Sequence, residues 1–385
     1  IGNGTANGSL NGDSNIIING AVLALNRSDS ITLANNISGT GGITISQNNN
    51  VELTGSASYT GNTSLAGGTL TYTNNVGPAS ANFTGTGSLV IQPSTSFSSA
   101  YNFSANVASA FTGVTIGSLS NTANITISRA ISVNGSINLF GGNIALNANL
   151  DAGTTTGSWL SLNTSGNVTQ NASSVISNGV RFGGGGGNLL LTNTANQIKQ
   201  LAASGVANMT VNNSYAAAAL GLNDISATGN IRVLNTVGLA VSGNISTSSV
   251  ANSTSTPALL LAAGYDQAAG NSGVMHSLIV NGTRSISVGN GGLGLIYTGS
   301  VTNSWNLNTI VPAGSGRFRY NTNTSYSLTA ATPGFNVTAA PLTVDASASN
   351  LYVMYREQPS LSIGAANSTS VYGTTFNTAM SSTAK

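Results

Sequence analysis

The stretch NITISRAISVNGSINLFGGNIALNANL, residues 124–150, decides the fold of this protein. Short segments in which apolar and polar residues alternate, such as 124–128, 136–140 and 143–147, are separated by Gly, Asn and Ser. This alternation is typical of half-buried strands, and Gly, Asn and Ser favour turns between them. Strong helix formers such as Glu, Lys, Gln and Arg are rare in the chain. The stretch therefore predicts many short strands and little or no helix.

A small residue followed by Asn and then by a strand recurs along the middle of the chain. The recurring residues are Asn124, Asn143, Asn167, Asn188, Asn208 and Asn230. They lie 19 to 24 residues apart, which is typical of one coil of a parallel β-helix. We expect successive Asn side chains to pair amide with amide, and roughly 300 residues to form about fourteen coils that stack ~4.8 Å apart.

The composition excludes several classes of function. Charged residues are 5% of the 385, against about 25% in an average soluble protein, while 40% are hydrophobic. Lys and Arg number 10 and are scattered singly, so the clustered cations of a nucleic-acid binder are absent. Zero cysteines exclude thiolate metal sites and Cys nucleophiles. No apolar run approaches the ~18–20 residues of a membrane span. We expect neither a nucleic-acid partner nor a membrane span.

The pattern of the sequence changes near residue 311. We predict a parallel β-helix over 1–310 with coils of about 19–24 residues, and a cap or transition β region over 311–358. A solenoid end must cover its core and its unpaired strand edges, which is the reason for expecting a cap. Residues 359–385 begin another unit. No signal peptide opens the chain, so we expect an internal piece of a longer protein.

Three stretches resemble known families. Residues 37–70, ISGTGGITISQNNNVELTGSASYTGNTSLAGGTL, are similar to repeats of autotransporter passenger domains. The middle of the chain, 142–247, resembles the filamentous-haemagglutinin-like exoproteins of two-partner secretion. Residues 351–376 resemble the point where the helix of such exoproteins gives way to YDG-type or immunoglobulin-like repeats, although the Asp of Val-Tyr-Asp-Gly is missing. The resemblance implies that 359–385 is the truncated start of such a repeat.

The resemblance also implies an all-β fold, a right-handed parallel β-helix with a small β cap or β domain at its C-terminal end. It implies export from a Gram-negative bacterium through an outer-membrane secretion pore, and a final place in the medium or on the outer surface. Adhesion, aggregation and biofilm formation are the implied roles, with a host or neighbouring cell surface, glycans or matrix as partners. A self-assembling extracellular fibre is the alternative reading, and a β-helical polysaccharide-degrading enzyme is a third.

Residues with catalytic potential are few. Asp29 and Glu52 alone have a one-coil spacing that would suit the carboxylate pair of a glycosidase. His276 is the single histidine, and a triad or zinc site needs partners for it. The glycine run 183–187 lacks the Lys and Ser or Thr of a phosphate loop, which favours a turn before a strand. We predict that the segment is not an enzyme and holds no cofactor or metal.

Two kinds of surface site remain as candidates. Trp159, Trp305, exposed Tyr residues and rows of Thr and Asn have the chemistry to bind carbohydrate, although an aromatic residue in a coil is more often core or cap. Asn-X-Ser/Thr sequons are the second kind, and the family resemblance implies glycosylation of some of them. These sequons include Asn62, Asn82, Asn124, Asn167, Asn244, Asn281 and Asn336.

Overall fold

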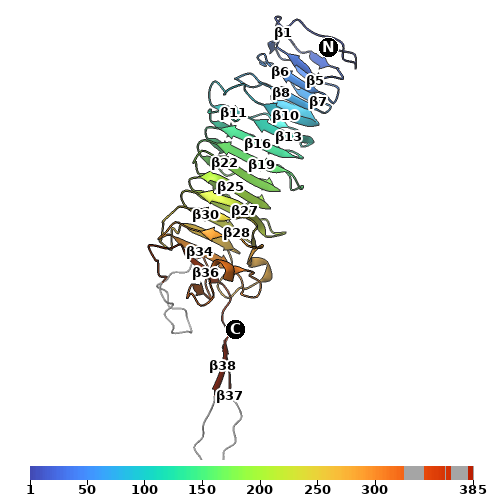
Figure 1. Ribbon diagram of the computed structural model, residues 1–385. Helices are drawn as coiled ribbons and strands as arrows, with labels where there is room; N and C mark the ends of the chain where they lie inside the picture. The colour runs from blue at the N-terminus through green and yellow to red at the C-terminus, as the bar shows by residue number, and fades with distance from the viewer. Residues whose placement is uncertain (325–341, 360, 366–379, 385) are drawn as a thin grey trace, which may run out of the picture.

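The computed structural model describes residues 1–324, 342–359, 361–365 and 380–384. The chain winds into an elongated stack of about 11 turns, with the N terminus at one end (Figure 1). Neighbouring strands of the stack belong to successive coils and run parallel. The all-β parallel β-helix predicted from the sequence is therefore confirmed. The turns are fewer than the fourteen expected, and one coil within residues 1–310 is much longer than the others: Leu239 and its register partner Leu278 lie 39 residues apart.

Three faces run along the stack, and successive strands of one coil belong to different faces. The largest sheet, called the long sheet here, has 14 strands. They are β3 (Ile31–Leu33), β6 (Asn50–Leu53), β8 (Thr69–Tyr72), β10 (Gly87–Ile91), β13 (Phe111–Ile116), β16 (Ser136–Gly141), β19 (Trp159–Thr164), β22 (Gly179–Gly184), β25 (Gln200–Val206), β27 (Leu220–Ala227), β29 (Leu239–Val241), β30 (Ile245–Thr247), β32 (Leu278–Val280) and β33 (Ile286–Ser287).

The second sheet has 11 strands and covers another face. They are β11 (Tyr101–Phe103), β14 (Ile125–Ile127), β17 (Ile144–Leu146), β20 (Val168–Gln170), β23 (Leu189–Leu191), β26 (Met209–Asn213), β28 (Ile231–Asn235), β31 (Leu259–Ala263), β34 (Leu293–Thr298), β36 (Asn350–Tyr355) and, at the edge, β35 (Phe318–Arg319).

Shorter sheets complete the coils. A five-stranded sheet near the N terminus contains β2 (Val22–Leu25), β5 (Gly42–Ile45), β7 (Thr63–Leu65), β9 (Asn82–Gly85) and β12 (Asn106–Val107). A four-stranded sheet in the middle contains β15 (Ile131–Ser132), β18 (Leu150–Asp151), β21 (Val175–Ser177) and β24 (Gln197–Ile198). Two isolated pairs are β1 (Ile16–Ile17) with β4 (Ile37–Ser38), parallel, and β37 (Leu361–Ala365) with β38 (Met380–Ala384), antiparallel.

The core is a continuous column of stacked apolar side chains. In the long sheet, Val114, Ile137, Leu160, Val180 and Leu201 occupy the same position in five successive coils, and each is buried. A parallel register keeps the inward residue of one coil directly above the inward residue of the next, because side chains alternate between the two faces of a strand. The short apolar alternation in the sequence is thus converted into one long core.

The recurring asparagines form a ladder along one corner, called the asparagine ladder here. Its six members are those predicted from the sequence, Asn124 to Asn230. At each step the backbone N–H of the Asn that comes later in the chain donates to the side-chain oxygen of the preceding ladder Asn, at 2.8–3.1 Å. At three steps the side-chain amide of the later Asn also donates to that oxygen. The expected amide pairing is therefore joined by a backbone bond, which satisfies an N–H that precedes each strand.

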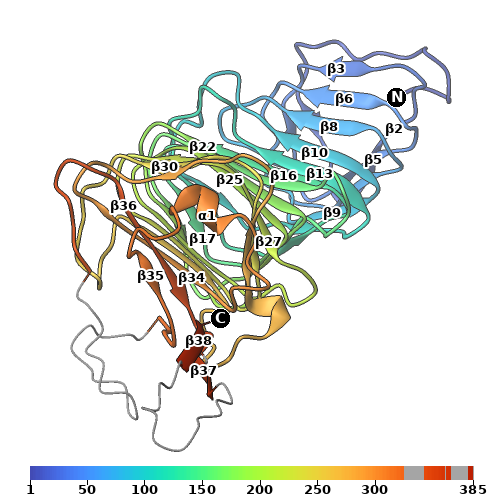
Figure 2. The same cartoon turned by 60° about the horizontal axis from the view of Figure 1, so that its bottom comes forward.

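Insertions close the C-terminal end of the stack. The short helix α1 (Leu307–Ile310) lies across the end of the coils, with Leu307 buried against the core (Figure 2). Arg356 is also buried, and its guanidinium donates to the carbonyl oxygens of Ala263, Asn271 and His276. These bonds fix the insertion that follows β31 against the end of β36.

Two parts of the C-terminal region were predicted as a cap or transition region (311–358) and as the start of a repeat (359–385). Within the first, β36 pairs in parallel with β34 and continues the second sheet. Within the second, only the β37–β38 pair and residue 359 belong to the described residues, and 366–379 lie outside them.

Candidate binding surface on the long sheet

The outer face of the long sheet carries mainly small polar side chains. In β16, Ile137 and Leu139 are buried, and the alternate residues Ser136, Asn138 and Phe140 face outward and are half-buried. A face of Ser, Thr and Asn has no charge of its own and few apolar surfaces. Larger or charged side chains on this face are therefore candidates for contact with a ligand.

Trp159 and Arg181 form the most distinctive contact on this face. In register, Trp159 lies opposite Gly179, and Ser161 lies opposite Arg181. A Cβ atom on Gly179 would lie 2.3 Å from the Trp159 ring, so only glycine leaves room for the indole. The guanidinium carbon of Arg181 lies 3.8 Å from the ring centroid, a cation–π contact. Arg181 is exposed and forms no ion pair within the described part of the chain.

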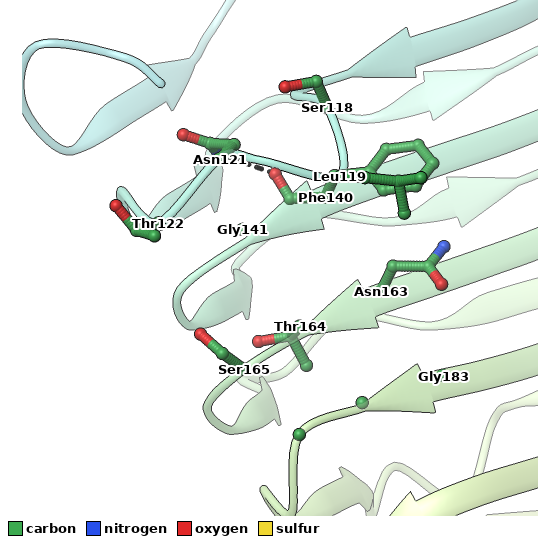
Figure 3. Close-up of a pocket in the computed structure, with 12 residues that line it drawn as sticks. Ser118, Leu119, Asn121, Thr122, Phe140, Gly141, Asn163, Thr164, Ser165 and Gly183 are labelled. Carbon is green, nitrogen blue, oxygen red and sulfur yellow. Dashed lines mark hydrogen bonds between the residues drawn. The ribbon is translucent and has the colours of Figure 1, made fainter. Parts of the chain in front are cut away.

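A shallow pocket of about 350 Å³ lies toward the other end of the same strands (Figure 3). Phe140 contributes a half-buried ring, and Leu119, in the turn after β13, is 88% exposed beside it. The side-chain amide of Asn121 donates to the Phe140 carbonyl oxygen at 2.7 Å, which joins this turn to β16. None of the residues that line the pocket is charged.

Asn163 supplies the polar group of this pocket. It lies between Phe140 of the preceding coil and Gly183 of the following coil. A Cβ atom on Gly183 would lie 2.9 Å from the Asn163 side-chain oxygen, so glycine again leaves space for its neighbour. The Asn163 amide makes no hydrogen bond within the described residues. Its two donors and its acceptor are thus available beside an aromatic ring, a combination typical of small-ligand sites.

A second cation lies at the corner from which β19 starts. The Lys199 ammonium donates to the carbonyl oxygen of Thr154 at 2.6 Å and lies 5.6 Å from the centroid of the Tyr215 ring. Thr154 belongs to the loop that leads into Trp159, so Lys199 reaches back over two coils. Both cations near Trp159 are held by neutral groups rather than by carboxylates.

The two carboxylates with one-coil spacing bind different partners. Arg27 forms an ion pair with Asp29 at 2.7 Å, and its hydrogen bond lowers the pKa of the Asp29 carboxyl. Glu52 instead lies opposite Thr32, whose hydroxyl donates to it at 3.3 Å. Asp29 thus precedes β3 whereas Glu52 lies opposite its middle. Over the described ranges, no three His, Asp or Glu residues form a group that could hold a metal ion.

His276 lies in a short 3-10 helix, and the glycine run spans the end of β22 and the turn that follows it. His276 ends the 3-10 helix η1 (Val274–His276), and burial, followed by the positive charge of Arg356, lowers the pKa of its imidazole. The glycines at 183–187 lead into β23, a strand and not a helix, as the sequence predicted. A Cβ atom on Gly187 would lie 1.6 Å from the carbonyl oxygen of Gly166, which explains why glycine is needed there.

Most of the sequon asparagines use their side-chain oxygen to accept a hydrogen bond from the next coil. This holds for Asn62, Asn82, Asn124, Asn167 and Asn244. Asn281 differs, because its amide donates to Ser242 at 3.0 Å, and Asn336 lies outside the described residues. Glycosylation of these asparagines stays a prediction.

The two tryptophans do not form one site. Trp305 is 65% exposed in the insertion next to α1, whereas Trp159 lies in the middle of the long sheet. Sequence reasoning named Trp159 but missed Phe140, Asn163 and Arg181. The coil period was the available signal, and it was too irregular to show which residues of adjacent coils lie side by side.

Comparison of the chain with protein-family models, with curated proteins and with solved structures found no match. No helix in the described residues has the length and hydropathy to cross a membrane.

Proposed function

We propose that this chain is a stalk or adhesin segment of a secreted bacterial surface exoprotein, of the filamentous-haemagglutinin-like or autotransporter type. In this proposal it acts outside the cell, mediates adhesion, aggregation or biofilm formation, and has no catalytic role. The observation that carries the proposal is the uninterrupted parallel stack of about 11 turns. At ~4.8 Å per turn such a stack holds a binding surface at a distance of several nanometres from its base.

The chemistry of the lateral faces supports the same role. Outward Ser, Thr and Asn residues hydrogen-bond between coils and leave the surface almost uncharged. A neutral surface places few like charges in register on adjacent strands, where they would repel. Such a rod is suited to presenting contacts along its length, and its few aromatic and charged groups then determine what it binds.

Adhesion of coated beads tests the proposal. We expect beads that carry the purified 1–385 chain to bind epithelial or bacterial cells several-fold more than beads that carry a Leu139→Asp variant. Leu139 is fully buried, and a carboxylate at this position disrupts the stack, so the variant controls for composition. Equal binding of the two bead types, or no binding of either to any cell type, would contradict an adhesive role.

A self-assembling fibre is the second candidate, and the N-terminal end of the stack favours it. Here β1, β2 and β3 are the last strands of their sheets, and Ile17 of β1 and Val22 of β2 are 67% and 61% exposed. Exposed apolar residues beside unpaired strand edges favour association with another chain. Under this proposal, electron cryomicroscopy and sedimentation show filaments that lengthen with concentration, and Ile17→Lys with Val22→Lys abolishes them. Isolated short rods at every concentration would exclude the fibre.

A further inference from the structure

We propose that the outer face of β16, β19 and β22 binds a linear polysaccharide that carries carboxylate groups, that is, one built with uronic acid units. The inference rests on the proposed adhesive function and names the class of its partner. The residues that carry it are Arg181 with Trp159 at one end, and Phe140 with Asn163 at the other.

Arg181 recognises the carboxylate. Its guanidinium lies on the Trp159 ring and has no carboxylate partner among the described residues, so the N–H groups at its edge are available. A guanidinium presents a planar fork that fits a carboxylate with two parallel hydrogen bonds. Stacking on the indole fixes the plane of this fork and lowers the entropy lost on binding. Trp159 is accordingly a positioning residue.

Phe140 and Asn163 form a subsite for the apolar ring face and the hydroxyl groups of one sugar unit. The apolar face of a pyranose ring packs on the half-buried Phe140 ring, and exposed Leu119 flanks it. The Asn163 amide then offers donors and an acceptor to ring hydroxyls. Gly183 keeps the space above Asn163 open, because any larger residue would approach its side-chain oxygen.

The two ends are spaced for an extended ligand. Trp159 and Asn163 lie on the same strand, four residues and therefore about 13 Å apart. Between them the face carries Asn138, Ser161 and the stem of Arg181, which share one register position in three coils. A short stretch of linear saccharide spans this distance along the strands, with hydroxyl and amide groups below it.

Charge and geometry select the ligand class. A neutral polysaccharide leaves the Arg181 fork without a partner, and a nucleic acid requires more clustered cations than this face has. Lys199 donates to Thr154 at the corner from which β19 starts and adds a second positive charge at this end of the face. Sulfate also accepts hydrogen bonds from arginine, but a planar carboxylate fits a stacked fork better.

Calorimetric titration of the 1–385 chain with the galacturonic acid hexamer tests the inference. We expect Arg181→Ala to weaken binding tenfold or more, Arg181→Lys to weaken it by less, and Phe140→Ala to weaken it several-fold. Arg232→Ala is the matched control, because Arg232 is an exposed arginine on β28 of the second sheet, and its affinity should equal that of the unsubstituted chain. Unchanged thermal unfolding verifies that each variant is folded.

Three results would overturn the inference: no binding of the hexamer, equal affinity of the Arg181→Ala variant, or equal affinity for neutral maltohexaose. Preference for a heparin hexasaccharide over the galacturonic acid hexamer would also overturn the carboxylate assignment. Bead adhesion that survives Arg181→Ala, with no hexamer binding, would refute this site alone. Hexamer binding without bead adhesion would refute the adhesive function and leave the site.

Discussion

At the scale of single residues, glycine determines how closely one coil approaches the next. Gly179 gives room to Trp159, Gly183 gives room to Asn163, and Gly187 lies against the backbone of the coil below. In each case the contact is with a residue of the preceding coil, about 20 positions earlier in the chain. Gly179 and Gly187, which meet a ring and a backbone carbonyl, are therefore required by packing between coils, whereas a larger residue at Gly183 would only displace the end of the Asn163 side chain.

The glycine run allows the packing argument to be tested at two nearby positions, Gly185 and Gly187. Gly187→Ala forces a Cβ atom against the Gly166 carbonyl oxygen, and we expect it to destabilise the protein by about 2 kcal/mol or more. Gly185→Ala is the control, because its Cβ atom would lie 3.5 Å from Ser165, an ordinary contact, and should change stability by ~0.5 kcal/mol or less. Urea unfolding followed by circular dichroism measures both. Similar midpoints for the two variants would contradict the packing argument.

At the scale of elements, the asparagine ladder joins strands that are neighbours in space but belong to different coils. The side-chain oxygens of the first five ladder residues, Asn124 to Asn208, each accept the N–H of the next ladder Asn, so the starts of β17, β20, β23, β26 and β28 are held in place. Turns of different length enter this corner, yet the ladder position is kept. The ladder therefore fixes the register of the second sheet from β14 to β28, while the turns absorb the changes in coil length.

Removal of one ladder side chain tests this role. Asn188→Ala removes the oxygen that accepts hydrogen bonds from the backbone N–H and the side-chain amide of Asn208. It also removes the side-chain amide that donates to Asn167, and we expect stability to fall by about 1–2 kcal/mol. Asn171→Ala is the control, because Asn171 pairs with Asn147 through side chains alone, and we expect less than half that loss. Hydrogen exchange should show faster exchange of the Asn208 amide in the first variant. An unchanged exchange rate there would refute the role of the ladder.

At the scale of the whole molecule, the scarcity of charge predicts an unusual dependence of stability on pH. With 8 acidic residues and 1 histidine in 385, few groups change ionisation between pH 5 and 9. Tyrosines are the main titratable groups whose pKa changes when the chain folds. Burial raises the pKa of Tyr59 and Tyr72, which are fully buried, and raises that of Tyr355 to about 12.

The sign of this effect follows from linkage. An unfolded tyrosine ionises near pH 10, whereas these folded tyrosines keep their protons to higher pH. Their contribution to stability is therefore complete below about pH 10 and decreases as the pH rises through the folded values. We expect a nearly constant Tm from pH 6 to 9 and a steep fall above about pH 10, measured by circular dichroism with tyrosinate absorbance. A steep fall below pH 9 would contradict this account.

The sequence by itself determined the strands, the parallel coils, the asparagine ladder and the neutral faces. Each of these depends on a local period that repeats along the chain, so it is visible without knowledge of the contacts. The sequence also named Trp159 as a candidate for carbohydrate binding. It did not predict α1, whose four residues are held across the end of the stack by burial of Leu307 and not by helix propensity.

Only the tertiary structure decided which outward residues lie side by side. Phe140 and Asn163 are register partners, but two residues separate Phe140 from the ladder residue Asn143 and three separate Asn163 from the ladder residue Asn167. Aligning the two strands by counting back from the ladder would therefore shift the register by one residue. Because side chains alternate between the two faces of a strand, a shift of one residue moves every side chain to the opposite face. The contact of Arg181 with Trp159 and the pairing of Phe140 with Asn163 therefore depend on turn lengths that packing between coils selects.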